Sequence, residues 1–458
     1  MIATTADSDV RRAYARDVSG LELTPEFVSR PASAAETVEL LKEAHDARVP
    51  VTTAGAQSST TGASITDSGI LLSLRGLAGG IVINPETRTA RVDAGVIVGD
   101  VRRAAAEHGL LFTPDPTSEE ESTVGGAVAC NASGARSLRY GATRPHVRAL
   151  TVALADGTVH EFRRSQLEKN TVGFAIAHEP VDWFVGSEGT LGVVLSAEFG
   201  LLPLPLQSIG LAIPFPNEAN ALAFVADARR SRKLNARCLE YFDNLALGIA
   251  REREGSNAPG TLGSCMVYAE ETGSDTDPES ELPLDAWLEL AEAHHADTGD
   301  IRVYDSEPAL LAARRLRHAV PSTMNERGSR FIAAGGRKVS TDWAVPFTLL
   351  AQTLDKARQH ADAAGIEQAV AYGHAGNGHP HQNFVARDAD ELRRIEKVVE
   401  ATLLDVLAVG GTVAAEHGIG KLKRKWLPLQ MSPVQQRAMR ALKCELDPLG
   451  LLAPGNVL

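Results

Sequence analysis

Cysteine is scarce in this chain, with only 4 among 458 residues. The four lie far apart and no two have a CxxC spacing, which argues against both a disulfide framework and an iron–sulfur cluster. We therefore expect these cysteines to be reduced and mostly buried. They are Cys130, Cys238, Cys265 and Cys444.

Positive charge is also in short supply, because 46 Lys and Arg face 58 Asp and Glu and the net charge is −12. A general nucleic-acid binder needs a basic field, so we expect no nucleic-acid partner. The chain has no apolar run of twenty residues, and its N-terminal segment MIATTADSDVRRAYARD carries acidic residues where a signal peptide has an apolar stretch. We therefore expect no transmembrane segment and a cytoplasmic location.

The remaining composition is that of a globular protein, with 44% hydrophobic and 23% charged residues. A chain of 458 residues is too long for one ordinary core, so we expect two or three domains. Closely spaced prolines in the segment LLPLP, residues 201–205, mark a boundary between them.

The first part of the chain alternates strands with loops of small residues. Ser33 and Glu36 form a capping-box pattern that predicts a helix over 33–47, followed by a strand over 49–53. The loop from Ala54 to Gly62 has no bulky side chain, which would let backbone N–H groups approach an anionic group such as a pyrophosphate. Residues 114–144 are small and polar, and we expect a long binding loop there.

Further elements of this part are short strands, a second helix and a hairpin. The expected strands are 70–74, 80–83, 89–92 and a region over 183–199, the helix is 98–108, and the hairpin is 150–162. Beyond residue 205 the pattern predicts an α+β domain with an antiparallel sheet. Its expected strands are 209–215, 237–240, 265–270, 301–304 and 339–345, and its expected helices are 218–232, 284–296, 309–318, 346–364 and 390–407.

The segment YGHAGNGHPHQN, residues 372–383, concentrates the chemistry of the chain. His374 and His381 lie seven positions apart, too far for one helical face, but the Gly-Asn-Gly between them predicts a hairpin reversal. A reversal would place the two imidazoles on opposing strands, where they can share zinc or manganese. Glu416 is the best candidate for a third, carboxylate ligand. The alternative is that these histidines are polar residues of an exposed turn.

Five blocks of the sequence, in order, resemble the FAD-linked oxidases of the vanillyl-alcohol oxidase type. The resemblance is to the metal-containing D-2-hydroxy-acid dehydrogenase branch, which includes D-lactate dehydrogenases, D-2-hydroxyglutarate dehydrogenases and glycolate oxidase catalytic subunits. It extends over nearly the whole chain, from Tyr14 to Gly455. The blocks are TVGGAVACNASGARSLRYGATR, FVGSEGTLGVV, GHAGNGHPHQN, GGTVAAEHGIGKLK and LDPLGLLAPGNVL.

The resemblance implies an α+β fold with a two-part FAD-binding domain in residues 1–205. A cap or substrate domain with an antiparallel sheet would occupy 206–407 and carry the metal hairpin, and 408–458 would complete the active site. FAD would be bound without a covalent link, since neither residues 53–64 nor residues 114–126 contain His or Cys. Its implied contacts are Ala54, Gly55, Ala56, Gln57, Ser58, Ser59, Asp115, Thr123, Gly125, Gly126, Asn131, Ser133, Gly134, Arg136, Tyr140, Glu188, Gly189, Gly192 and Val193.

The implied activity is oxidation of a D-2-hydroxy acid to the 2-oxo acid with hydride transfer to FAD. By the resemblance, the metal ligands are His374, His381 and Glu416, and His417 is the active-site base. Three residues would bind the substrate carboxylate: Arg317, Lys338 and Asn383. For Arg317 the alternative is a solvated basic helix face, and for Lys338 an exposed strand end.

The sequence departs from the family pattern at several positions. The first flavin loop reads GAQSST instead of a glycine-rich run, and the metal loop has Asn377, His379 and Pro380 where GDGNLH is usual. His379 is therefore an extra ligand, a substrate contact or a turn residue. Pro321 stands where some relatives have a polar side chain.

Two other classes compete with this interpretation. An alkylglycerone-phosphate-synthase-like transferase would carry a triple-histidine tract where this chain has Ala415-Glu416-His417, and a metal hydrolase would leave the flavin half unexplained. An oxidase of another alcohol also stays open. We expect electrons to pass to oxygen, a quinone or a carrier protein, and we allow for a homodimer.

Overall fold

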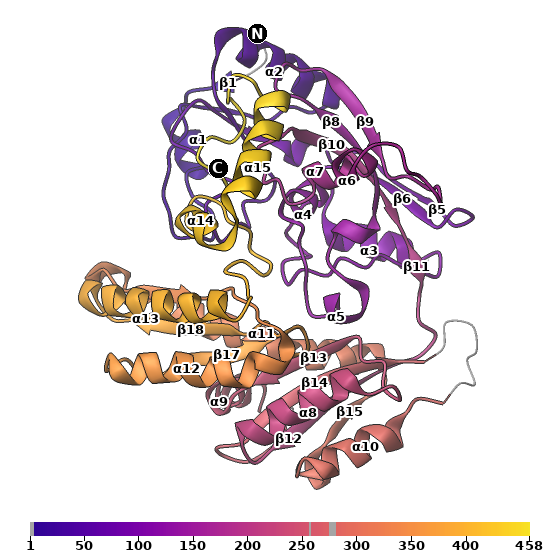
Figure 1. Ribbon diagram of the computed structural model, residues 1–458, viewed down its shortest axis with the longest axis vertical. Helices are drawn as coiled ribbons and strands as arrows, with labels where there is room; N and C mark the ends of the chain where they lie inside the picture. The colour runs from indigo at the N-terminus through magenta and orange to yellow at the C-terminus, as the bar shows by residue number, and fades with distance from the viewer. Residues whose placement is uncertain (1–3, 256–257, 274–280) are drawn as a thin grey trace. The chain divides into compact units, whose positions relative to one another are not determined.

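The computed structural model describes residues 4–255, 258–273 and 281–458, which form two compact units (Figure 1). The first unit consists of Met1–Gly134, Gly141–Leu204 and Glu416–Leu458, and the second of Ala135–Tyr140 and Pro205–Ala415. Within the described residues, no helix combines the length and the apolar character needed to cross a bilayer. The four cysteines are free thiols, with Cys238 and Cys265 buried and Cys444 exposed.

The first unit begins with a four-stranded sheet in the order β1 (Thr4–Thr5), β2 (Phe27–Ser29), β4 (Ile70–Ser73) and β3 (Val51–Ala54). Strands β2, β4 and β3 run parallel, and helix α2 (Ala34–Ala47) precedes β3. Ser33 caps α2 by accepting the Glu36 N–H, as predicted. The predicted capping box is incomplete, however, because the Glu36 carboxylate accepts from the N–H of Ala32 instead of Ser33.

A five-stranded antiparallel sheet follows in the same unit, ordered β5 (Ile81–Asn84), β6 (Thr89–Asp93), β10 (Val193–Gly200), β8 (Val147–Ala153) and β9 (Val159–Arg163). The predicted hairpin is confirmed as β8 and β9, which turn at Asp156-Gly157. Helix α3 (Val98–Ala106) packs on this sheet, and β7 (Leu110–Leu111) pairs with β11 (Leu202–Pro203).

Two expectations for residues 114–199 are wrong in detail. The supposed loop of residues 114–144 contains two helices, α4 (Val124–Cys130) and α5 (Ser137–Tyr140). Small residues serve helix packing here, since a Cβ on Gly125 would lie 2.8 Å from Cβ of Ala94. The supposed strand region 183–199 begins with helix α7 (Val181–Phe184), and only β10 is extended.

The C-terminal segment packs back into the first unit. Helix α14 (Leu427–Gln430) leads to α15 (Pro433–Leu446), which has a complete capping box between Ser432 and Gln435. Leu452 then bridges to Val51 beside β3 and joins the core of the first sheet. The sequence interpretation did not identify either helix.

The second unit is built on one seven-stranded sheet, and all its neighbouring strands are antiparallel, as expected. The order is β15 (Arg302–Tyr304), β12 (Ser208–Phe215), β14 (Cys265–Thr272), β13 (Cys238–Phe242), β17 (Val370–Gly373), β18 (His381–Ala386) and β16 (Arg337–Ser340).

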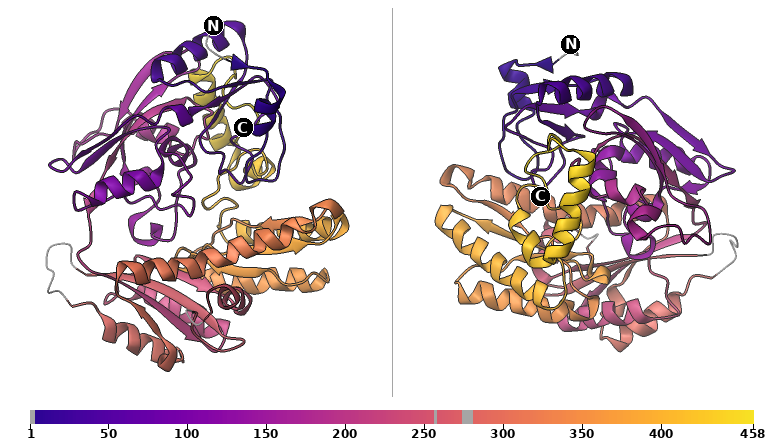
Figure 2. Two further views of the ribbon diagram at one scale, coloured as in Figure 1. Left: turned by 180° about the vertical axis from the view of Figure 1, so that it is seen from behind. Right: turned by 45° about the horizontal axis from the view of Figure 1, so that its top comes forward.

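Helices cover both faces of this sheet. One face packs against α9 (Asn244–Glu254) and α11 (Glu307–Ser329), which appear in front when the molecule is viewed from behind (Figure 2). The other face carries α8 (Glu218–Arg230), α10 (Leu284–Ala293), α12 (Leu350–Ala363) and α13 (Ala389–Ala408). Helix α11 is longer than predicted, because it continues through Pro321 to Ser329. Below, the face covered by α9 and α11 is called the α11 face.

Candidate active site

The predicted reversal between the two histidines is present in the second unit. Strand β17 pairs with β18 so that Tyr372 lies opposite His381. A short 3-10 helix, Ala375–Asn377, makes the turn, and Gly378 closes it with a φ of +69°. A Cβ on Gly378 would lie 2.0 Å from the carbonyl oxygen of Val345, so only glycine fits there. One detail differs from expectation: His374 lies just beyond β17 and is not on a strand.

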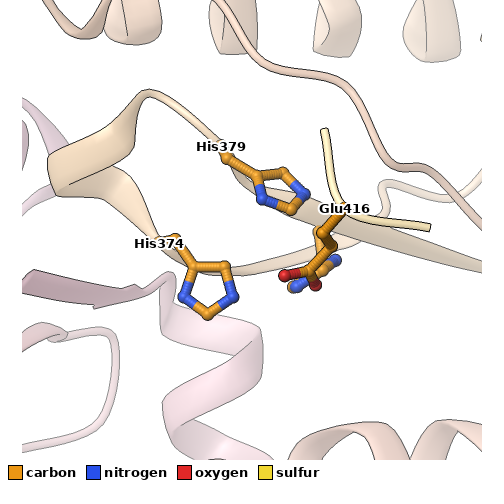
Figure 3. Close-up of side chains that lie close together, drawn as sticks. His374, His379 and Glu416 are labelled. Atoms are coloured by element: carbon orange, nitrogen blue, oxygen red, sulfur yellow. The ribbon is translucent and has the colours of Figure 1, made fainter. Parts of the chain in front are cut away.

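The turn brings together a set of side chains suited to a metal ion. Each member offers one ligand atom, and these atoms all lie within 4.8 Å of one another. The three histidines are buried, with exposures of 3%, 4% and 6%, so they are not polar residues of an exposed turn. Figure 3 shows the two labelled rings and the carboxylate turned toward a common space. The set is His374, His379, His381 and Glu416.

Glu416 owes its place to the chain that precedes it. Thr412 exchanges backbone hydrogen bonds with Ala344, and the N–H of Ala415 donates to the carbonyl oxygen of Asp342 at 3.3 Å. These bonds fix the end of the second unit beside the segment that follows β16. Since Glu416 is the next residue after Ala415, its backbone must start from that point.

A buried carboxylate orients the first histidine of the cluster. Nδ1 of His374 lies 2.6 Å from Oε1 of Glu240, and Nε of Arg317 donates to Oε2 of Glu240 at 2.6 Å. Burial by itself would raise the pKa of Glu240, but His374 and Arg317 more than offset this and hold it below its usual range. Glu240 is therefore an ionised acceptor for Nδ1–H of His374, which leaves the lone pair on Nε2. That lone pair faces Nη2 of Arg317 at 3.1 Å, so a cation bound by His374 would replace this hydrogen bond.

The predicted substrate residues lie on the same face of the sheet as this pair. Strand β16 pairs with β18 so that Lys338 lies opposite Val385 and Ser340 opposite Asn383. Opposite residues in an antiparallel pair share a face, and Val385 packs in the core under α11. Arg317 projects from α11 onto Glu240. The α11 face therefore carries Arg317, Lys338 and Asn383.

Two of these side chains have unusual surroundings. Nζ of Lys338 donates to Asn325 at 2.8 Å, and burial lowers the pKa of Lys338 to about 8. Asn383 is 1% exposed and donates through Nδ2 to the Tyr372 hydroxyl, while its Oδ1 has no hydrogen-bond partner among the described residues. A half-turn of this amide would keep the bond to Tyr372 and present Nδ2 instead.

In the first unit, the loop after β3 is held by its own polar groups. Gln57 has a φ of +58°, and its amide donates to the carbonyl oxygens of Tyr14 and Arg16 at 3.0 Å. The Ser59 hydroxyl accepts the N–H groups of Thr61 and Ala63. Gln57 and Ser59 therefore shape the loop. A Cβ on Gly55 would lie 2.3 Å from Oγ1 of Thr123, so glycine lets the loop pack against the residue that caps α4; contacts of Ala54, Gly55, Ala56 and Ser58 with FAD stay predictions.

The predicted contacts around α4 follow the same principle of close approach. Thr123 caps α4 by accepting the Gly126 N–H, and Asn131 ends it with a φ of +49°. A Cβ on Gly134 would lie 2.0 Å from the carbonyl oxygen of Asp115, so these two segments touch through backbone. Ser133 donates to Glu416 at 3.4 Å.

Arg136 and Tyr140 belong to the second unit, unlike the other predicted flavin contacts. Nε of Arg136 donates to Oε2 of the buried Glu270 at 2.9 Å, and Arg237 donates to the same oxygen at 2.7 Å. Arg136 thus has a structural role on the α11 face, and its contact with FAD stays a prediction.

Glu188 connects the predicted flavin segment with the loop of His417 inside the first unit. Its carboxylate accepts the N–H groups of Ile419 at 2.6 Å and Gly420 at 2.7 Å. Burial raises the pKa of Glu188 despite these bonds. Nε2 of His417 lies 3.6 Å from Oε1 of Glu416, and its carbonyl oxygen accepts from Thr61 at 3.3 Å. Next to Glu188, Gly189 has a φ of +74°, Gly192 packs against Val152, and Val193 begins β10.

The residues present fit both implied groups. Three imidazoles and a carboxylate are the donor set of borderline divalent metals, and their ligand atoms lie within 4.8 Å of one another. In the first unit, the buried hydroxyls of Thr60, Thr113 and Ser122 have no hydrogen-bond partner among the described residues. Thr60 lies in the first predicted flavin loop, Thr113 directly precedes the second and Ser122 lies within it, so all three suit a polar ligand.

Four functional candidates of the structure are not identified by the sequence analysis. They are Glu240, Asp342, Thr60 and Thr113. A charged residue inside the apolar strand CLEYF was a usable signal for Glu240, because an unpaired buried carboxylate is costly. Hydroxyls in a loop rich in Ser and Thr give no comparable signal.

The fold and the site together define a flavin-linked oxidoreductase with a cluster of residues that could bind a metal ion. Comparison with known proteins supports the flavin-linked class. Residues 25–163 match the FAD binding domain family, and 207–457 match the C-terminal domain of FAD linked oxidases. The chain belongs to the FAD-linked oxidases, in the group that comprises D-lactate, glycolate and D-2-hydroxyglutarate enzymes.

Similar proteins span nearly the same length. The chain is 31% identical to a D-lactate dehydrogenase of Archaeoglobus fulgidus, over 94% of this chain and 90% of the relative. It is 29% identical to glycolate oxidase subunit GlcD of Bacillus subtilis and to a D-2-hydroxyglutarate dehydrogenase of Xanthomonas citri, over 94% of this chain and 89% of each relative. A solved alkyldihydroxyacetonephosphate synthase has the same fold, with a TM-score of 0.74 and 16% identity over 98% of this chain and 82% of that one.

Proposed function

We propose that this protein oxidises a D-2-hydroxy acid to the 2-oxo acid, with non-covalent FAD and a divalent cation held by the histidine cluster. The observation that carries the proposal is a buried set of three histidines and Glu416 in a chain of the FAD-linked oxidases. Relatives named for D-lactate, glycolate and D-2-hydroxyglutarate support a small hydroxy acid as the substrate.

The reaction removes one proton and one hydride from the alcohol. When bound, a divalent cation would make the substrate hydroxyl more acidic, and FAD would accept the hydride with its two electrons. We assign His417 as the base that receives the hydroxyl proton, because it adjoins the carboxylate of the cluster. Oxygen, a quinone or a carrier protein would be the final acceptor of the two electrons.

We propose that the α11 face of the second unit binds the substrate carboxylate. Arg317 and Lys338 supply positive charge, and Asn383 supplies an amide that a half-turn makes into a donor. An unpaired buried amide is costly, so a carboxylate that uses it would bind with high specificity. The proposal requires the flavin of the first unit to reach the acid bound at this face.

We propose the small-residue segments of the first unit as the FAD site. The unsatisfied hydroxyls of Thr60, Thr113 and Ser122 support a polar ligand there. The transferase alternative has no support beyond the shared fold, because that likeness is only 16% in sequence.

Anaerobic bleaching of the flavin absorbance by a panel of D- and L-2-hydroxy acids tests the proposal. We expect D acids to bleach the flavin rapidly, and we expect chelator-treated protein to regain this reaction only after a divalent metal is added. Bleaching that survives verified metal removal would reject the cation, and a colourless protein that takes up no FAD would reject the whole assignment.

A further inference from the structure

We infer that His379 is a fourth protein ligand of the cation, which is then held by three imidazoles and one carboxylate. This inference rests on the proposed function, because it presumes that the cluster binds a cation. The family's usual loop has asparagine at this position, so the additional ligand would distinguish this chain within its family.

His379 occupies the cluster as fully as the two histidines expected from the sequence. Its ring centroid lies 5.3 Å from that of His374 and 4.6 Å from that of His381, while the latter two are 5.4 Å apart. Its ligand atom shares the 4.8 Å limit with the others. At 4% exposure, it is buried, whereas a turn residue without a partner would be expected to face water.

One nitrogen of the His379 ring has incomplete hydrogen bonding among the described residues. Its buried Nε2 makes no hydrogen bond within the described residues, although Oδ1 of Asp342 is only 3.3 Å away. An unsatisfied buried polar atom costs about 1–3 kcal/mol. Coordination through the other ring nitrogen would fix the tautomer and let Nε2–H donate to Asp342. Asp342 would then support His379 as Glu240 supports His374.

The backbone keeps His379 at this place. Its N–H donates to the carbonyl oxygen of His374 at 3.1 Å, which closes the turn. Pro380 follows and restricts the backbone of His379 to extended conformations, and Gly378 before it is pressed against Val345. The backbone of His379 is therefore held next to the cluster, where its buried ring lies among the other ligand residues.

A fourth protein ligand restricts the kind of cation. Four protein ligands complete a tetrahedral zinc site and leave no position for a substrate. A 2-hydroxy acid that binds through both its hydroxyl and its carboxylate needs two more positions, for a total of six. Manganese, iron(II), cobalt and nickel accept six mixed nitrogen and oxygen ligands. We therefore infer a six-coordinate ion of the manganese type in place of zinc.

Manganese binding measured by the EPR signal of free Mn²⁺ tests this assignment on chelator-treated, FAD-loaded protein. We expect one ion per wild-type chain, and a Kd raised on the order of 10-fold or more for His379→Asn. His360→Asn is the matched control, because His360 is also paired with a carboxylate, Asp405 at 2.8 Å, but lies outside the cluster. Its Kd should equal that of wild type.

The outcomes separate the two proposals. If His379→Asn binds Mn²⁺ with the same Kd as wild type, His379 is not a ligand. In that case the proposal that the cluster binds a cation still stands, because the wild-type protein binds Mn²⁺. Failure of wild-type protein to bind Mn²⁺, Co²⁺ or Zn²⁺ overturns the cation itself. X-ray absorption of manganese-loaded wild-type protein needs no variant: three imidazoles among six ligands support the inference, and two imidazoles overturn it.

Discussion

Nδ1 of His374 and Oε1 of Glu240 lie 2.6 Å apart on the α11 face, at a position where Glu240 is 1% exposed. The same carboxylate binds Arg317 through its second oxygen. Glu240 thus fixes the ring that begins the histidine cluster and the guanidinium that we assign to the substrate. A metal-binding imidazole commonly has a carboxylate of this kind on its other nitrogen.

Replacing Glu240 with Gln should weaken cation binding on the order of 10- to 100-fold, because His374 loses its charged orienting partner. The variant should also unfold more easily, by about 3 kcal/mol, since Arg317 keeps a nearly buried charge without its partner. Mn²⁺ titration and denaturant unfolding measure the two effects.

Glu270→Gln is the matched control for this change. Glu270 is another buried carboxylate of the α11 face, paired with Arg136 and Arg237 but with no histidine of the cluster. We expect a comparable loss of stability with unchanged cation affinity. Equal losses of cation affinity in both variants would mean that Glu240 acts through general stability and not through His374.

Lys338 makes the proposed substrate binding dependent on pH. Burial lowers the pKa of Lys338 to about 8, so its ammonium is charged below that pH and neutral above it. The KM for a 2-hydroxy acid should therefore be constant below about pH 8 and rise above it. Lys338→Met should raise KM at low pH and abolish this rise. A wild-type KM that stays constant through pH 9.5 would contradict the role.

The sequence was sufficient to predict much of the fold, because periodicity and turn chemistry are local. The hairpin at Asp156-Gly157 and the reversal before His381 followed from such signals. Helix α4 could not be predicted because its small residues are typical of a loop, and the packing of Gly125 against Ala94 is visible only in the structure. The predicted helix ends at residue 318, three residues before Pro321, because proline usually ends or kinks a helix. In the structure α11 continues past Pro321 to Ser329.

The site shows the same division between local and distant information. His374 and His381 could be selected from spacing within one segment. Glu240 lies 134 positions before His374. Asp342 follows β16 and is separated from the turn by α12 and β17, so no local pattern links either residue to the cluster. Their roles depend on the pairing of β13 with β17 and on the path of the chain after β16.

Gly378 tests whether the turn itself organises the cluster. Its φ is +69°, and a Cβ there would meet the Val345 carbonyl oxygen at 2.0 Å. Gly378→Ala should cost clearly more than the roughly 1 kcal/mol of a positive-φ alanine, and it should weaken Mn²⁺ binding. Gly410→Ala is the control, since Gly410 has a φ of +76° and nothing within 4 Å of an added Cβ. Equal unfolding free energies for the two variants would show that the contact with the Val345 carbonyl oxygen does not destabilise Gly378→Ala.

Glu188 is predicted to act on catalysis through the loop of His417. Its carboxylate accepts two N–H groups, from Ile419 and Gly420, just beyond that histidine. In Glu188→Gln, the amide oxygen can still accept one of these N–H groups, but the amide NH₂ would face the other. This unsatisfied N–H should lower the free energy of unfolding by about 1–3 kcal/mol. At saturating substrate, flavin reduction should slow while KM changes little.

A double-mutant cycle decides whether Glu188 works through His417. His417→Ala alone should slow anaerobic flavin reduction on the order of 10²-fold or more without releasing FAD. If Glu188 only positions this base, Glu188→Gln should slow the His417→Ala protein hardly further, so that the two effects are strongly non-additive. Fully additive effects would show that Glu188 acts independently of His417, through the flavin or through stability. Glu198→Gln, which alters a peripheral pair with Arg163 in the same unit, should leave the reduction rate unchanged.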